Sequence, residues 1–462
     1  MEQDLAYNLL RNQDFYLAPI CILILLFFAR AMKKNYQDTP LEKYVFPAMG
    51  LRLLGVFVYT LVIRYYYGFG DSHNYYQALI DMYHAVKDDS SILWDIILKN
   101  KMETTDRLYN YFVYDGYGYT QYYMMDHRSY NVPRMALPFA LIFQRSFLCV
   151  SFCISYLSFL GSWRIFKMFY EMYPHLHRKL AYGILFLPSV IFWGTSLLKD
   201  SFSVVALGFF VYAAYSLLIK RRKVIISAII LYITGNVLFI LKPYILICIS
   251  AVFLLWFFML FRKKIKDKIS RTVSTLLFII ISALAGFFIS QAIAKKEAKS
   301  KFLSGELLLS IKAQQTTFSR NLELGSGSNF SIGKASSPLQ LALLFPLGIV
   351  NTYFRPFPWD VMSPIMLLSC LESLCYLAIT IMCFRRVGFG KTFNIIFSDP
   401  VISFCFVFAI LFGAIIGIAT SNFGALVRYK IPILAFYVVT FILVMDKSGK
   451  FSNTYIFSKK LF

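Results

Sequence analysis

The chain has 462 residues, is 58% hydrophobic with a mean hydropathy of +0.61, and carries only 15% charged residues, against about 25% in soluble globular domains. Several apolar runs reach the roughly 20 residues that cross a bilayer as a helix, which excludes a soluble globular protein and predicts an all-α polytopic membrane protein. The formal charge of +23 does not indicate nucleic-acid binding, because the bases lie in short clusters between apolar runs and no nucleic-acid-binding motif is present.

Eleven candidate transmembrane helices can be read from the hydropathy pattern: 15–30, 45–66, 146–168, 180–198, 202–219, 224–241, 244–261, 272–293, 361–384, 400–420 and 431–445. The first is predicted to be retained rather than cleaved as a signal peptide, because acids outnumber bases before it and a basic cluster follows it. With the N-terminus outside, the clusters 220–223, 262–266 and 385–386 fall on the cytoplasmic side, as the positive-inside rule requires. The C-terminus is then cytoplasmic.

We therefore predict a single transmembrane domain, 1–462, with two large external loops. The first, 67–135, is acidic and rich in tyrosine. Its aromatic residues are typical both of an interfacial belt against lipid and of a platform for sugar rings or a lipid-linked substrate. The second, 294–360, contains an apolar run at 339–353 that is too short to span the bilayer, which predicts a re-entrant or interfacial helix.

The stretch 64–76 (RYYYGFGDSHNYY) lies where a long apolar run stops and a polar segment begins. Gly68 and Gly70 allow a sharp turn and a close approach to a ligand. Asp71 is the first acid after the apolar run, and we predict that it is catalytic. His73 and Tyr76 follow it and are predicted to contact the substrate.

Five bases fall at predicted outer helix ends, where the positive-inside rule does not explain them: Lys199, Lys242, Arg355, Arg428 and Lys430. A phosphate or pyrophosphate group explains them, because arginine binds phosphate through two parallel hydrogen bonds and lysine acts as a point charge. Two structural alternatives stay open at this point. Lys199 can form a local pair with Asp200 at a helix end, and Lys242 can extend to the membrane interface.

Other catalytic chemistries have little support in this sequence. The eight cysteines all fall within apolar runs, which favours core packing over disulfides or a thiolate metal site. The Asp71-x-His73 pair is too weak a signal to predict a metal. The chain has no phosphate-binding Walker loop, dinucleotide fingerprint, Gly-x-Ser-x-Gly elbow, or zinc or haem signature, so we predict no metal and no cofactor.

Two short segments resemble GT-C-type glycosyltransferases, which use polyprenyl-phosphate-linked sugars. The segment 70–75 (GDSHNY) resembles the one that opens the first large external loop of those enzymes, and 428–432 (RYKIP) is similar to their Arg-Tyr-x-x-Pro start of a late helix. Together with 187–200 (LPSVIFWGTSLLKD) and 354–360 (FRPFPWD), these segments also resemble O-antigen or capsule polymerase-like membrane proteins of bacterial polysaccharide loci.

The resemblance implies a GT-C-like helical bundle in the inner membrane. It implies transfer, on the periplasmic side, of a polyprenyl-phosphate- or pyrophosphate-linked sugar to a glycan or lipid acceptor. Asp71 would be the general base or orient the acceptor, while Arg355 and Arg428 would stabilise the departing phosphate. The expected substrate contacts are His73, Tyr76, Lys199, Lys242, Trp359, Tyr429 and Lys430. The alternatives are a polymerase that joins lipid-linked repeat units, a transporter of lipid-linked glycans, and a non-enzymatic scaffold.

Overall fold

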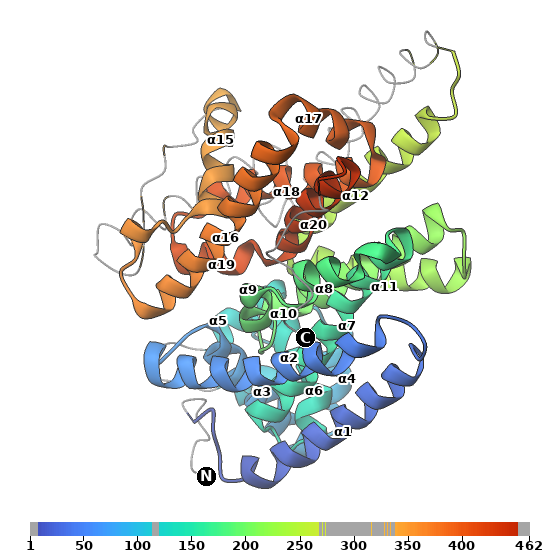
Figure 1. Ribbon diagram of the computed structural model, residues 1–462. Helices are drawn as coiled ribbons and strands as arrows, with labels where there is room; N and C mark the ends of the chain where they lie inside the picture. The colour runs from blue at the N-terminus through green and yellow to red at the C-terminus, as the bar shows by residue number, and fades with distance from the viewer. Residues whose placement is uncertain are drawn as a thin grey trace. The chain divides into compact units, whose positions relative to one another are not determined.

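The computed structural model describes residues 8–112, 120–267 and 338–450, with a few isolated positions between 270 and 333. Every regular element in these ranges is a helix, and the residues group into two compact units, Met1–Leu246 and Ile247–Phe462 (Figure 1). Eight of the described helices are long and apolar enough to cross a membrane, or nine if one bent pair counts as a single span. The prediction of a multi-pass all-α membrane protein is confirmed at this level.

Most of the predicted spans correspond to single helices in the described ranges. The long helices are α1 (Asp14–Lys34), α2 (Val45–Leu61) extended by η2 (Val62–Tyr67), α7 (Phe147–Met172), α10 (Lys199–Ala214) extended by η5 (Tyr215–Ile219), α11 (Val224–Leu241), α12 (Pro243–Arg262), α16 (Pro364–Val387) and α18 (Pro400–Ala419). The last span is a pair bent by 65°, α19 (Phe423–Tyr429) and α20 (Ile431–Lys447). The predicted span 272–293 lies outside the described residues.

The predicted span 180–198 is not one helix, and this part of the prediction is wrong. It consists of α8 (His177–Leu185) and α9 (Pro188–Trp193), followed by a non-helical connection to α10. Leu187 is extended, with φ −72° and ψ 121°, as expected for a residue that precedes proline. Proline also lacks the N–H that would continue the helical ladder, so the break is encoded at Pro188.

Contacts along the helices of the first unit fix their relative directions. Helices α1 and α7 run parallel, since Ser146 donates a hydrogen bond to Asp14 at one end and Tyr36 packs on Trp163 towards the other. Helix α2 runs antiparallel to α7, because Tyr44 meets Phe166 whereas Phe57 meets Phe152.

Helix α10 also runs parallel to α7, because the broken α8–α9 segment returns the chain between them. Gly208 lies against Gly161, and further along Tyr212 donates to Glu171 (2.8 Å). Helix α11 is antiparallel to α10, since Lys242 pairs with Asp200. One end of the unit therefore collects the starts of α1, α7 and α10 and the ends of α2 and α11, and the opposite end collects Lys33, Lys34 and the basic cluster 220–223.

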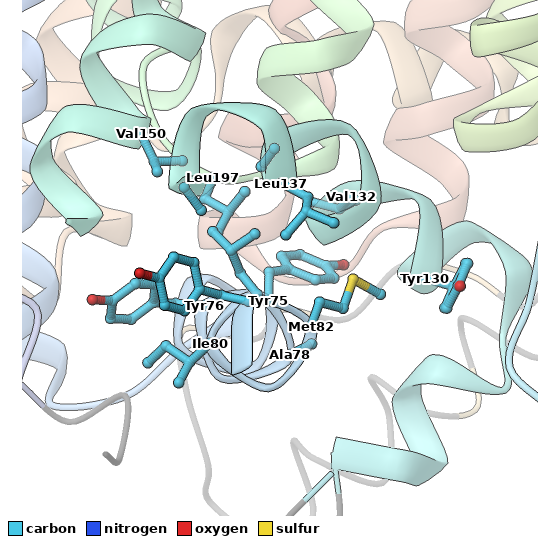
Figure 2. Close-up of a cluster of buried hydrophobic side chains, with 14 of the residues drawn as sticks. Tyr75, Tyr76, Ala78, Ile80, Met82, Tyr130, Val132, Leu137, Val150 and Leu197 are labelled. Carbon is cyan, nitrogen blue, oxygen red and sulfur yellow. The ribbon is translucent and has the colours of Figure 1, made fainter. Parts of the chain in front are cut away.

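The segment 67–112 and 120–135, predicted as an external loop, is built largely of helices in the first unit. It contains α3 (Asp71–Asp88), α4 (Ile92–Leu98), η3 (Arg107–Tyr111), α5 (Thr120–Met124) and the start of α6 (His127–Ile142). Figure 2 shows side chains of α3, such as Tyr75 and Met82, beside Val132 and Leu137 of α6 in a buried apolar cluster. Much of the aromatic content of this segment therefore forms a core.

Helices α7 and α10 approach so closely that their glycines touch. A Cβ atom added at Gly208 would lie 2.0 Å from the carbonyl oxygen of Gly161, which no side-chain movement relieves because the obstacle is backbone. Small residues that let two helix backbones meet are a common feature of membrane helix packing.

We expect Gly208→Ala to destabilise the first unit by about 1–3 kcal/mol, the usual cost of overpacking a tight contact. Thermal unfolding of the detergent-solubilised protein measures the loss. Gly50→Ala, in α2, is the matched control because a Cβ there meets nothing within 4 Å. An equal melting temperature for the two variants would contradict the close α7–α10 contact.

In the second unit, the helix α15 (Pro338–Phe354) packs along α18 in the antiparallel sense. Gly348 lies against Gly417, and Tyr353 donates to the carbonyl of Ala409 (2.8 Å). The predicted re-entrant or interfacial helix at 339–353 is thus a 17-residue helix, and its depth in the bilayer stays a prediction. The unit is completed by α16, α17 (Phe389–Ser398), α18 and the bent pair α19–α20, with α20 buried along almost its whole length.

Candidate functional site

Three of the predicted site residues lie at the same end of the first unit, each at the end of a helix. Asp71 is the first residue of α3, Lys199 is the first residue of α10, and Lys242 directly follows α11. The helix directions described above bring these ends together, although more than 120 residues separate Asp71 from Lys199 in the sequence.

Asp71 is exposed and follows a turn that requires only one of the two glycines. Gly68 has φ 71°, a left-handed conformation that disfavours side chains, whereas Gly70 has φ 175° and is extended, a conformation open to any residue. As the first residue of α3, the carboxylate of Asp71 also lies near the positive end of the helix dipole.

Lys199 is the centre of a polar cluster at this end. Its Nζ donates to Ser129 Oγ (3.1 Å) and lies 3.7 Å from Asp126 Oδ2, with the ring of Tyr75 5.9 Å away. Asp71 is close enough for its charge to stabilise the ammonium. The ammonium therefore lies within the electrostatic influence of two carboxylates, one of which, Asp71, is exposed.

The second carboxylate near Lys199 belongs to Asp126, which the sequence did not single out. It caps α6, accepting hydrogen bonds from the backbone N–H (3.0 Å) and the hydroxyl (2.9 Å) of Ser129. Burial acts to raise the pKa of Asp126, but Lys199 and the bonds from Ser129 outweigh it and hold the pKa below its usual value. Asp126 is therefore ionised at neutral pH and serves as the counterion of Lys199.

Lys242 forms a buried ion pair with Asp200, with 5% and 2% of the two side chains exposed. Both structural alternatives from the sequence are corrected by this pairing. Asp200 does not pair with its neighbour Lys199, because successive residues in a helix point in different directions. Lys242 does not extend to the interface, because its ammonium is held inside the unit.

His73 and Tyr76, predicted to bind the substrate, are both buried on α3. Phe69 stacks on the ring of His73 at 5.4 Å, and Tyr76 donates to the carbonyl of Arg145 (2.9 Å). Their roles as substrate contacts stay predictions. Both side chains are part of the buried packing that holds α3, the helix that begins at Asp71, in place.

Arg355, in the second unit, is held by an acidic and two aromatic side chains. Its guanidinium makes two hydrogen bonds to Asp360, Nε to Oδ2 (3.0 Å) and Nη2 to Oδ1 (2.8 Å), and lies over the stacked rings of Phe330 and Phe423 at 4.4 and 4.9 Å. Trp359 is 79% exposed and stacks on Phe357. The guanidinium of Arg355, which the sequence assigned to phosphate, therefore binds Asp360 in this structure.

The carboxyl of Asp360 is expected to make the stability of the second unit depend on acidic pH. Burial acts to raise the pKa of Asp360, but its bonds from Arg355 and from the N–H of Phe357 (2.8 Å) leave the pKa below its usual value. A carboxyl with a lowered folded pKa stabilises the fold above its unfolded pKa, about 3.9, and this contribution is lost as the pH falls through the folded pKa.

We therefore expect Asp360→Asn to lower the melting temperature at pH 7, by the loss of about 1.5–3 kcal/mol for charged hydrogen bonds, and the difference from the wild type to shrink as the pH falls below about 3.9. Thermal unfolding of the wild type and the variant across this range measures the difference. A constant difference at all pH values would show that the ionised form of Asp360 contributes nothing.

Lys430 is fully buried at the bend between α19 and α20. Its Nζ donates to Ser373 Oγ (3.3 Å) and lies 5.7 Å from the ring of Tyr376, with Glu372 within electrostatic range. Ser373 in turn donates to the carbonyl of Arg355 (3.0 Å). An ammonium has three donors, and Lys430 uses one of them in the described part of the chain. Arg428 and Tyr429 precede the bend on α19 and are partly buried.

The structure thus forms two groups from the predicted residues, one in each unit. Asp71, Lys199 and Lys242 share one end of the first, and Arg355 and Lys430 are linked through Ser373 in the second. The sequence missed the partners Ser129, Asp126, Asp360 and Ser373, and it assigned Asp200 to Lys199 rather than to Lys242. Asp360 could have been found, because it lies five residues from Arg355 across a proline-rich turn; the others lie too far away in the chain. In the described ranges, no three His, Cys, Asp or Glu side chains come together as a metal site would need.

Comparison of the chain with family models, with curated proteins and with solved structures found no match. These two groups of residues are the features of the chain that point to a function.

Proposed function

We propose that this protein is an inner-membrane glycosyltransferase that uses a polyprenyl-phosphate-linked sugar on the periplasmic side, in the synthesis of an envelope polysaccharide. The observation that carries the proposal is the cluster at one end of the first unit, where the exposed carboxylate of Asp71 lies within electrostatic reach of Lys199. The basic clusters 220–223 and Lys33–Lys34 lie at the opposite end. Under the positive-inside rule that end is cytoplasmic, so Asp71 faces the periplasm.

The chemistry that suits this cluster is activation of an acceptor hydroxyl. Asp71 takes the hydroxyl proton as the oxygen attacks the anomeric carbon of the donor sugar. The bond from that carbon to the phosphate oxygen breaks, and the lipid phosphate leaves with the electron pair. Lys199 is held in place by Asp126 and Ser129 and contributes a fixed positive charge near Asp71.

The second unit has its own group of cations, which suits a phosphate group. Lys430 is a buried ammonium with one hydrogen bond to a serine, and a desolvated cation of this kind favours an anionic ligand. Arg428, on α19, lies two residues before Lys430. Ser373 connects Arg355 to Lys430, because it accepts from Lys430 and donates to the carbonyl of Arg355. In this proposal Arg355, Arg428 and Lys430 bind a phosphate group of a lipid-linked sugar in the second unit.

The test is an analysis of lipid-linked glycans in a strain that lacks the gene. A lipid-linked glycan missing one sugar supports the transferase. Accumulation of single lipid-linked repeat units would instead assign the protein as a polymerase, and retention of finished units on the cytoplasmic leaflet would assign it as a transporter. Unchanged glycans would reject all three activities.

A further inference from the structure

A cavity of about 450 Å³ lies in the first unit between α1, α2 and α7, apart from the residues placed in the proposed reaction. Its walls are mainly apolar, from Ala18, Pro19 and Ile22 of α1, Phe57 and Leu61 of α2, and Leu148 of α7. Its volume falls within the roughly 300–1,000 Å³ of small-ligand pockets. The chemistry of these walls suits a hydrocarbon chain.

The helices around this cavity are membrane spans whose outer sides are exposed in the unit. Phe15, at the start of α1, is 85% exposed, and Leu61 of α2 is 48% exposed; both residues line the cavity. In a bilayer, these side chains face lipid rather than water. The occupant therefore reaches the cavity from the bilayer and does not need to pass through water.

One end of the cavity is polar, and its charged surroundings favour an anion. Arg11 lines this end and lies over the ring of Tyr76 at 5.7 Å. Arg64 Nη1 donates to Asn8 Oδ1 (2.6 Å), two residues before the cavity-lining Leu10. The acid present, Asp14, already accepts bonds from Ser146 and from the backbone of Arg11, and Arg11 provides the guanidinium that lines the cavity.

We propose that this cavity binds one acyl chain of an anionic bilayer phospholipid, with its phosphate beside Arg11. The bound lipid fills the space between α1 and α2 and joins them to α7. Because Arg11 lies over the ring of Tyr76 on α3, the bound lipid also stabilises the position of α3. It does not contact the reacting groups. This inference is independent of the sugar-transfer proposal, because binding is measured without any transfer reaction.

The test uses the full-length protein in phosphatidylcholine nanodiscs that contain phosphatidylglycerol with a photoreactive diazirine in its acyl chain. After irradiation, mass spectrometry locates the labelled residues. We expect labelling of Phe15, Pro19 and Leu61, and a decrease of at least fivefold in Ala18→Phe and in Leu148→Trp, which fill the cavity from two different helices. Leu26→Phe, at an exposed position of α1 that does not line the cavity, is the control and keeps the labelling.

The headgroup is tested by Arg11→Gln, with Arg30→Gln at the other end of α1 as its control. Removing a basic residue that contacts an anionic headgroup lowers lipid binding by about fivefold, and only the Arg11 variant is expected to show this decrease. Labelling spread evenly over α1 and α2 and unchanged by the cavity-filling variants would overturn the site. Equal competition by unlabelled phosphatidylcholine, or stronger competition by polyprenyl phosphate than by phosphatidylglycerol, would overturn the assignment to an anionic phospholipid.

Discussion

Asp71→Asn is expected to lower the rate of sugar transfer by about 100- to 10,000-fold, the range that a positioned general base contributes. The amide keeps the size and hydrogen-bonding shape of the carboxylate but cannot accept the proton of the acceptor hydroxyl. Transfer from a polyprenyl-phosphate-linked sugar, measured with the purified protein in liposomes, gives the rate.

The fold should survive this change, because Asp71 is exposed at the first turn of α3 and the core contacts of that helix lie further along it. Asp88→Asn is the matched control: Asp88 is exposed and ends the same helix, about 25 Å from its first residue at 1.5 Å per residue. The control is expected to keep wild-type activity. A near-normal rate for Asp71→Asn, with a normal melting temperature, would reject its role as the base.

Asp200→Asn is expected to destabilise the protein by about 3–5 kcal/mol, the cost of leaving one partner of a buried ion pair without its counterion. The ammonium of Lys242 would remain inside the unit, between α10 and α11, with no carboxylate from Asp200 to balance it. Thermal unfolding in detergent measures the loss, and proteolysis of the membrane-inserted protein gives an independent measurement.

The double variant Asp200→Asn/Lys242→Met separates the lost charge balance from lost packing. Replacing both members of a buried pair by neutral residues is often neutral or stabilising, so the second change should recover most of the stability. Glu103→Gln, which breaks the exposed Lys101–Glu103 pair (3.2 Å), should change stability by about 1 kcal/mol at most. If the double variant is as unstable as the single one, the ion pair does not explain the loss.

Hydropathy predicted the transmembrane helices well because membrane burial acts on each segment separately. A run of about 20 apolar residues with internally satisfied backbone hydrogen bonds is stable in lipid whatever its neighbours are. Helices α1, α11 and α18 therefore lie where the sequence placed them. The failure at 180–198 has a local cause that composition hides, because its average hydropathy is high while Pro188 interrupts its helical ladder.

Charge partners could be predicted much less well, because an ion pair depends on which helix faces which. The sequence placed Lys199 beside Asp200, yet the α6 cap supplies its carboxylate partner, Asp126, and Asp200 pairs with Lys242. Arg355 was assigned to phosphate because it lies in a rigid proline-rich corner, and that same corner brings Asp360 onto its guanidinium. An excess of bases in a sequence therefore overestimates the number available to a ligand.

By itself, the sequence determined that this is a multi-pass helical membrane protein, since that property follows from the free energy of moving each apolar segment into lipid. It also pointed to Asp71, the first acid after an apolar run, and to Lys199, Arg355 and Lys430, because the positive-inside rule does not explain bases at outer helix ends. Only the tertiary structure decided that α7 and α10 run parallel, which brings Lys199 to Asp71, and that 67–112 folds into packed helices. These features arise from contacts between segments far apart in the chain, whose free energy no local pattern records.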